Sequence, residues 1–182
     1  MKILFVCTGN ICRSPMAEQM LFQLLEQHNP ELEIQVSSAG TMALDGYPMD
    51  PKAAIAITKL GFAHLRHKAT QLTHQLVAEA NLVLTSTVEQ RAQVVELLVK
   101  ANRYTFTLKE FGHLAEFEQS ERDQTKNLSL EQQLADTISL RGFATLDEDQ
   151  DLADPYQRDQ TKFDIAAAQT LTALQQVVSW LP

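Results

Sequence analysis

Residues 2–20 read KILFVCTGNICRSPMAEQM, and they join a short apolar run to an amphipathic segment through a polar turn. The apolar run, residues 2–7, is rich in bulky or β-branched side chains, which is typical of a buried parallel strand. Met16, Met20 and Leu24 then recur at helical spacing, with polar residues between them. The stretch therefore predicts a strand, a loop and a helix in immediate succession.

The alternation of strands and helices continues along the chain. Apolar runs predict further strands at residues 33–39, 82–84 and 103–108, and helical periodicity predicts helices at residues 51–60, 88–99, 129–141 and 171–181. This pattern indicates an α/β fold of three layers, with a four-stranded, mostly parallel twisted sheet and helices on both faces. Active sites in such sheets lie at the carboxyl ends of strands, and the first such junction follows residue 7.

The length of 182 residues fits a single domain, residues 1–182. Residues 112–150 interrupt the alternation with a polar, acid-rich segment, which we interpret as an insertion within that domain. The formal charge of −8 argues against a nucleic-acid partner. No stretch reaches the roughly 18 apolar residues of a membrane span, the first apolar run is too short for a signal peptide, and two cysteines make no disulfide framework. We therefore expect a cytoplasmic protein with no membrane partner.

The polar turn, residues 7–15 (CTGNICRSP), places Arg six positions after Cys, between a strand and a helix. A loop of this length can curl around a tetrahedral phosphate, with its amides turned inward and a helix N-terminus behind it. Arg13 can bind two phosphate oxygens with its planar fork, and Pro15 suits the first helical position. The expected phosphate-binding residues are Thr8, Gly9, Asn10, Ile11, Cys12, Arg13 and Ser14.

Cys7 is the expected nucleophile of this loop. A free thiol has a pKa near ~8.5, and a helix N-terminus with nearby cations lowers such a value. Cys7 would then attack phosphorus as a thiolate, and the loop would stabilise the transition state without a metal or other cofactor. A lone cysteine is more often an inert packing residue. Its spacing from Gly9, Arg13 and Pro15 favours catalysis here.

This segment resembles the signature of the low-molecular-weight protein tyrosine phosphatase family, V-C-x-G-N-x-C-R-S-P-x-A-E, which residues 6–18 match throughout. The similarity extends to residues 38–41, 67–72, 80–85 and 154–156. It implies a four-stranded parallel sheet and hydrolysis of protein phosphotyrosine through a phosphocysteine on Cys7. A phosphorylated protein would then be the substrate and inorganic phosphate a product.

A general acid is needed because tyrosine leaves as a phenolate, and a positioned acid raises the rate by about 10²–10⁴-fold. Residues 147–154 supply several acids, and spacing alone does not distinguish Asp154 from Asp149 or Asp151. Asp154 precedes Pro155, which rigidifies the turn presenting it. The resemblance implies that this Asp-Pro pair carries the general acid.

The resemblance also implies supporting residues around the loop. Asn10, Ser14, Ser38 and His67 match family positions that form a hydrogen-bond network, and Ser14 can donate to the Cys7 thiolate. Taken singly, His67 is more often a surface or core filler.

The walls of the cleft are expected to include Ile11, Tyr47 and Tyr156. Tyr156 matches a family aromatic that lines the cleft, and Tyr47 is expected on the opposite side. Two roles are possible for Cys12. The resemblance implies that it closes a reversible disulfide on oxidised Cys7, whereas otherwise it is a buried packing residue.

Metal sites are not supported by the sequence. His64 and His67 have the spacing of two zinc ligands, but no further ligand set accompanies them. The acids from Asp147 onward mimic the start of a calcium loop but lack its Gly and its final Glu.

Other functions remain as alternatives. Protein arginine phosphatases share the loop but typically carry Thr in place of Ile11, whose apolar edge suits a phenyl ring. Asp45-Gly46 and residues 105–110 look more like that arginine branch. Arsenate reduction by a thiol relay needs further cysteines, which the chain lacks. A non-catalytic phosphate-binding module would have lost the nucleophile or the acid, and both are present. The oligomeric state is not predicted.

Overall fold

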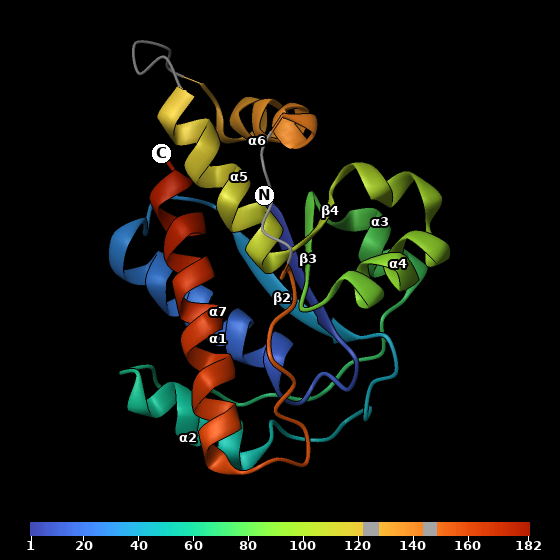
Figure 1. The fold of residues 1–182 in the computed structure, drawn as a ribbon, viewed down its shortest axis with the longest axis vertical. Coiled ribbons are helices and arrows are strands. Elements are labelled where there is room, and N and C mark those ends of the chain that lie inside the picture. Colours follow the sequence, from blue (N-terminus) through green and yellow to red (C-terminus); the bar gives the residue numbers. More distant parts are fainter. Residues whose placement is uncertain (122–127, 144–148) are drawn as a thin grey trace.

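The computed structural model describes residues 1–121, 128–143 and 149–182, and Figure 1 shows its fold. A four-stranded sheet has the order β2-β1-β3-β4. Its strands are β1 (Lys2–Cys7), β2 (Gln35–Gly40), β3 (Leu82–Thr85) and β4 (Thr105–Thr107). Each of its pairings is parallel, which confirms the predicted type of sheet.

Helices cover both faces of this sheet, as Figure 1 shows. One face packs against α1 (Arg13–His28), α2 (Pro51–Lys59), α5 (Leu108–Glu121) and α7 (Gln160–Trp180). The other face packs against α3 (His74–Glu79), α4 (Val88–Leu97) and the 3₁₀ helix η1 (Val99–Arg103). The three-layer α/β fold is therefore confirmed. Within the described ranges, no helix is long and apolar enough to cross a membrane.

Strand β1 lies inside the sheet, and its side chains alternate between two cores. Ile3 and Phe5 join the core formed with α1, α5 and α7, while Leu4 and Val6 join the core formed with α3 and α4. None of the four is more than 2% exposed. Burial on both faces explains why this strand reads as a continuous apolar run.

The predicted strand at residues 103–108 is wrong at both ends, since β4 covers Thr105–Thr107 and α5 begins at Leu108. Helix α5 was missed, although its buried residues Leu108, Phe111 and Ala115 recur at helical spacing. Polar residues between them disguised the pattern. The short helix α3 was missed as well, because six residues carry too little periodicity.

The segment interpreted as an insertion is described except for residues 122–127 and 144–148. Its first part continues α5, and the helix predicted at residues 129–141 corresponds to α6 (Leu130–Ser139) with the 3₁₀ helix η2 (Leu140–Gly142). Its status as an insertion, and a single domain over the whole chain, stay predictions.

Buried polar contacts hold this segment against the rest of the fold. Arg141 Nε donates to Glu110 Oε1 at 2.8 Å, and Arg91 Nη1 donates to Glu110 Oε2 at 3.2 Å. Glu110 is 2% exposed, so two guanidinium groups offset the cost of burying its carboxylate. Trp180 Nε1 donates to Thr137 Oγ1 at 2.9 Å. Helix α6 is thereby anchored to α7, and η2 to α5.

Candidate active site

The loop between β1 and α1 lies at the carboxyl edge of the sheet, as the sequence predicts. Strand β1 ends at Cys7 and helix α1 begins at Arg13, so the intervening turn faces the helix N-terminus. Pro15 is the third residue of the helix and not the first. It still lies in the first turn, where an amide hydrogen has no helical acceptor.

The carbonyl groups of this loop point away from its centre. The carbonyl oxygens of residues 7–12 accept hydrogen bonds, in chain order, from the amides of Thr41, Met42 and Leu44, the ring of His67, and the amides of Asp50 and Met16. Within one trans peptide unit, the C=O of a residue and the N–H of the next residue point in opposite directions. The loop amides are therefore left facing the interior, where an anion can bind.

Cys7 Sγ lies at the base of the loop. Ser14 Oγ is 2.9 Å from it, and the backbone amide of Asn10 donates to it at 3.3 Å. Cys7 is only 3% exposed, yet it lines a cavity of about 210 Å³. A substrate can therefore reach the sulfur, and two donors are placed to stabilise a thiolate.

Asn10 maintains the shape of the loop. Its φ of 53° lies in the left-handed region, which Asn adopts more readily than most residues. Its Nδ2 donates to Ser14 Oγ at 2.9 Å and to Ser38 Oγ at 2.8 Å, and its Oδ1 accepts from Thr70 at 2.8 Å. His67 Nε2 donates to the Asn10 carbonyl at 2.7 Å. The structure thus brings together the four residues expected to form a network.

Glu18 extends this network, and sequence reasoning gave it no role. Ser38 Oγ donates to Glu18 Oε2 at 2.5 Å, and His67 Nδ1 is 3.9 Å from the same oxygen. Burial raises the pKa of the Glu18 carboxyl, while the Ser38 hydrogen bond and the nearby His67 act in the opposite direction. A Glu within a helix is usually exposed to solvent. The signal that could have indicated a role for Glu18 was its position as the last residue of the family signature.

Arg13 and Asp154 meet at the cavity, although they are far apart in the sequence. Arg13 Nη2 is 3.2 Å from Asp154 Oδ1, and both residues line the cavity. The Arg13 side chain is 7% exposed and that of Asp154 is 60% exposed, so the carboxylate approaches from the solvent side. The backbone amide of Tyr156 donates to Asp154 Oδ1 at 3.2 Å and orients this carboxylate.

The other candidate acids have different partners. Asp149 Oδ2 is 3.1 Å from Lys109 Nζ, and Asp151 Oδ1 accepts from the backbone amide of Val88 at 2.8 Å. Neither acid lines the cavity. Residues 147 and 148 lie outside the described residues. Asp154 is therefore the described acid of this segment that lines the same cavity as Cys7.

The walls of the cavity differ from the expectation on one side. Ile11 and Tyr156 line it, as expected. Tyr47 does not line it and is 62% exposed, because a turn with a left-handed glycine after Leu44 directs the chain away. Met42 and Leu44 form that wall instead. Nothing in the sequence distinguished them from other exposed apolar residues.

Cys12 is 5% exposed and, like Cys7, is a free thiol. Burial raises the pKa of the Cys12 thiol, and the charges of Asp50 and Cys7 act in the same direction. Cys12 is therefore protonated at neutral pH and is poorly suited to be a nucleophile. Whether it serves as a redox partner or as a packing residue stays a prediction.

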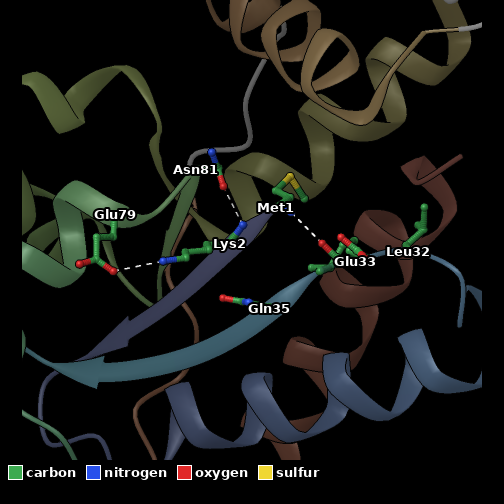
Figure 2. A pocket seen from close by; sticks show the side chains of 8 residues that line it. Met1, Lys2, Leu32, Glu33, Gln35, Glu79 and Asn81 are labelled. Atoms are coloured by element: carbon green, nitrogen blue, oxygen red, sulfur yellow. Dashed lines mark hydrogen bonds and ion pairs between the residues drawn. The ribbon is translucent and has the colours of Figure 1, made fainter.

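A larger cavity lies at the opposite edge of the sheet, at the amino ends of β1 and β2 (Figure 2). Two of its charged side chains pair with each other, Lys2 Nζ and Glu79 Oε2 at 3.1 Å. The amide of Lys2 also donates to Asn81 Oδ1 at 2.7 Å. Ligands of parallel sheets bind at the carboxyl edge, so the loop at Cys7 is the candidate active site.

Gly40 packs closely against this loop. A Cβ at Gly40 would lie 2.5 Å from the carbonyl oxygen of Thr8 and 3.0 Å from Cα of Ala43. We expect Gly40→Ala to displace the loop, lowering kcat/KM about 10- to 100-fold and the free energy of unfolding by about 1–3 kcal/mol. Hydrolysis of nitrophenyl phosphate and urea unfolding measure the two effects. The control Gly142→Ala places a Cβ with no atom within 4 Å, and losses as large there would contradict the explanation.

Comparisons with known proteins agree with this geometry. A family model described as low molecular weight phosphotyrosine protein phosphatase matches residues 2–124. The probable low molecular weight protein-tyrosine-phosphatase EpsP of Ralstonia solanacearum is 37% identical over 133 residues, which cover 73% of this chain and 86% of that protein. A protein-arginine-phosphatase of Bacillus subtilis is 37% identical over 111 residues, covering 61% and 72% of the two chains. A solved YwlE arginine phosphatase mutant with a phosphorylated active-site serine has a TM-score of 0.72 and 25% identity, covering 98% of this chain and 94% of that one.

Proposed function

The chain belongs to the low molecular weight phosphotyrosine protein phosphatase family, and from this premise we propose that it hydrolyses protein phosphotyrosine through a phosphocysteine on Cys7. The observation that carries the proposal is the orientation of the loop. Its carbonyl groups are all bonded outward, and Cys7 Sγ lies at the base of the amides that face inward. A dianion can bind there directly against the nucleophile.

The first half-reaction transfers the phosphoryl group to sulfur. The substrate phosphate accepts hydrogen bonds from the loop amides and from Arg13, which then exchanges its contact with Asp154 for phosphate oxygens. Cys7 Sγ attacks phosphorus, and an S–P bond forms as the bond to the tyrosine oxygen breaks. Asp154, in its protonated form, gives its proton to that oxygen.

The second half-reaction releases phosphate. Water attacks the phosphorus of the phosphocysteine, and the Asp154 carboxylate takes up its proton. The S–P bond breaks, and the electron pair returns to sulfur as a thiolate, with Ser14 and the Asn10 amide beside it. The phosphorylated active-site serine in the related YwlE mutant supports a covalent intermediate of this kind.

Hydrolysis of protein phosphoarginine is the second candidate. The relative named as a probable protein-tyrosine-phosphatase and the relative named as a protein-arginine-phosphatase are each 37% identical to this chain. The walls of the cavity favour tyrosine. Ile11, Met42, Leu44 and Tyr156 present mainly apolar surface to a flat ring. Of the described residues that line the cavity, Asp154 alone is acidic, so a phosphoguanidinium would meet a single carboxylate.

Two peptides of the same sequence, one with phosphotyrosine and one with phosphoarginine, test this choice. We expect kcat/KM to be at least about tenfold higher for phosphotyrosine. Ile11→Thr removes an apolar edge and is expected to narrow that ratio, while the control Ile11→Val keeps it. A preference for phosphoarginine in the wild-type enzyme would reverse the assignment of the substrate.

The biological setting follows from the same proposal. The substrate is a phosphorylated protein, and inorganic phosphate is the second product. We also propose a cytoplasmic location, because the free thiols of Cys7 and Cys12 suit a reducing compartment. No nucleic acid, membrane or metal takes part in the proposed reaction.

A further inference from the structure

Gln90 is a buried polar residue that has no part in the chemistry above. It lies in the first turn of α4 and is 4% exposed. The N-cap residue of this helix, Thr87, accepts a hydrogen bond from the Gln90 amide through its side chain at 3.2 Å. The Gln90 side chain therefore starts from a capped helix end, whose backbone is held in place.

Both ends of the Gln90 carboxamide are hydrogen-bonded. Oε1 accepts from the Ser86 amide at 3.1 Å, and Nε2 donates to Thr8 Oγ1 at 3.1 Å. Because the Ser86 amide can only donate, Oε1 must face it and Nε2 must face Thr8. Thr8 directly follows Cys7 and lines the same cavity. Gln90 thus connects the start of the phosphate loop to the turn between β3 and α4.

The turn between β3 and α4 also holds the segment that carries Asp154. The Leu152 amide donates to the Ser86 carbonyl at 2.9 Å, two residues before Asp154. Hydrogen bonds therefore lead from Thr8 through Gln90 and Ser86 to the segment of the proposed general acid. This connection spans three parts of the chain that are far apart in the sequence.

The direct contact between the phosphate loop and this segment is given up in the proposed reaction. Arg13 Nη2 is 3.2 Å from Asp154 Oδ1, and Arg13 exchanges this contact for phosphate oxygens when substrate binds. The attachment to α4 does not involve the phosphate. It includes a further hydrogen bond, from the Val88 amide to Asp151 Oδ1 at 2.8 Å. The connection through Gln90 therefore persists while substrate is bound.

We propose that Gln90 is a positioning residue, which sets the distance between the phosphate loop and Asp154 in the substrate complex. The inference rests on the proposed function. A general acid must come within about 2.6–3.2 Å of the oxygen that it protonates, and a displacement of about 1 Å can lower a rate on the order of 10²-fold. Loss of the Gln90 contacts is therefore expected to slow proton transfer more than phosphate binding, which the loop amides and Arg13 provide.

Gln90→Met tests the inference, because Met has a similar length and lacks the two hydrogen bonds. We expect kcat for a phosphotyrosine peptide to fall about tenfold, with KM changed less than about threefold. For nitrophenyl phosphate, whose leaving group is stable without a proton, we expect kcat to fall less than about threefold. A purely structural role would lower both rates by the same factor. The control Gln93→Met alters the same helix three residues further on, where Oε1 has no hydrogen-bond partner in the described part of the chain, and is expected to keep both rates.

Thr8→Val tests the same contact from the phosphate loop. Val keeps the shape of the side chain and the backbone amide, and it removes the hydroxyl that accepts from Gln90. We expect the same selective loss on the phosphotyrosine peptide. Because the two substitutions break one shared contact, the double variant is expected to be no slower than Gln90→Met alone.

The outcomes separate this inference from the proposed function. Equal losses on the two substrates, an unchanged rate on the peptide, or independent losses that multiply in the double variant overturn the positioning role and leave the phosphatase assignment standing. If Gln90→Met does not fold, Thr8→Val decides by the same comparison of substrates. Absence of turnover of both substrates by the wild-type enzyme overturns both proposals.

Discussion

Cys7→Ser is expected to lower kcat/KM for phosphotyrosine peptides by about 10⁴-fold or more while the protein stays folded. A serine hydroxyl is a much weaker nucleophile than a cysteine sulfur. Ser14 Oγ at 2.9 Å and the Asn10 amide at 3.3 Å surround the attacking atom, so the smaller oxygen fits without strain. Initial rates on a phosphotyrosine peptide measure the loss.

The variant also separates chemistry from binding. The loop amides and Arg13 remain, so Cys7→Ser is expected to bind inorganic phosphate with an affinity near that of the wild type. The matched control Cys12→Ser alters a buried, protonated thiol on the same loop and is expected to keep most of the activity. If Cys12→Ser were as inactive as Cys7→Ser, or if Cys7→Ser kept substantial turnover, the assignment of the nucleophile would be wrong.

Asp154→Asn is expected to lower kcat for phosphotyrosine peptides by about 10²–10⁴-fold, because Asn cannot protonate the departing phenolate. The loss is expected to be smaller for nitrophenyl phosphate, whose leaving group is stable without a proton. Binding is expected to persist, because Asn keeps the size of the side chain and no longer competes with phosphate for Arg13. Steady-state kinetics on the two substrates separate kcat from KM.

The pH dependence gives a second readout of Asp154. In the wild type the rate is expected to fall on the alkaline side of the profile, since an ionised carboxylate has no proton to donate. Asp154→Asn is expected to remove that fall. The control Asp149→Asn changes an acid that pairs with Lys109 outside the cavity and is expected to leave the profile unaltered. A wild-type rate that still rises above about pH 8 would argue against Asp154 as the acid.

The phosphate loop could be predicted from the sequence because its parts are contiguous. A buried apolar run ends at Cys7, Arg13 follows within one loop, and a helix begins there. Such a site is built mainly from backbone amides and a helix N-terminus, which depend on local chain geometry. The residue types and their spacing therefore carried most of the information about the site.

Residues contributed by distant segments were harder to assign. Spacing left Asp149, Asp151 and Asp154 equivalent, and the structure separates them by their partners. Helix α5 escaped notice because its charged residues resemble a solvated surface, although Glu110 is buried and paired with Arg141. Charge in a sequence indicates exposure only until a partner from elsewhere in the chain is known.

The sequence by itself determined the α/β fold and predicted the phosphate loop and the proposed nucleophile, because strand burial, helical periodicity and loop geometry are local properties of the chain. Only the tertiary structure decided that Met42 and Leu44 replace Tyr47 in the wall of the cavity, and that Gln90 contacts Thr8 of the phosphate loop. Those contacts depend on how distant segments pack and hydrogen-bond together. Many small long-range interactions set that packing, and no single stretch of sequence encodes it.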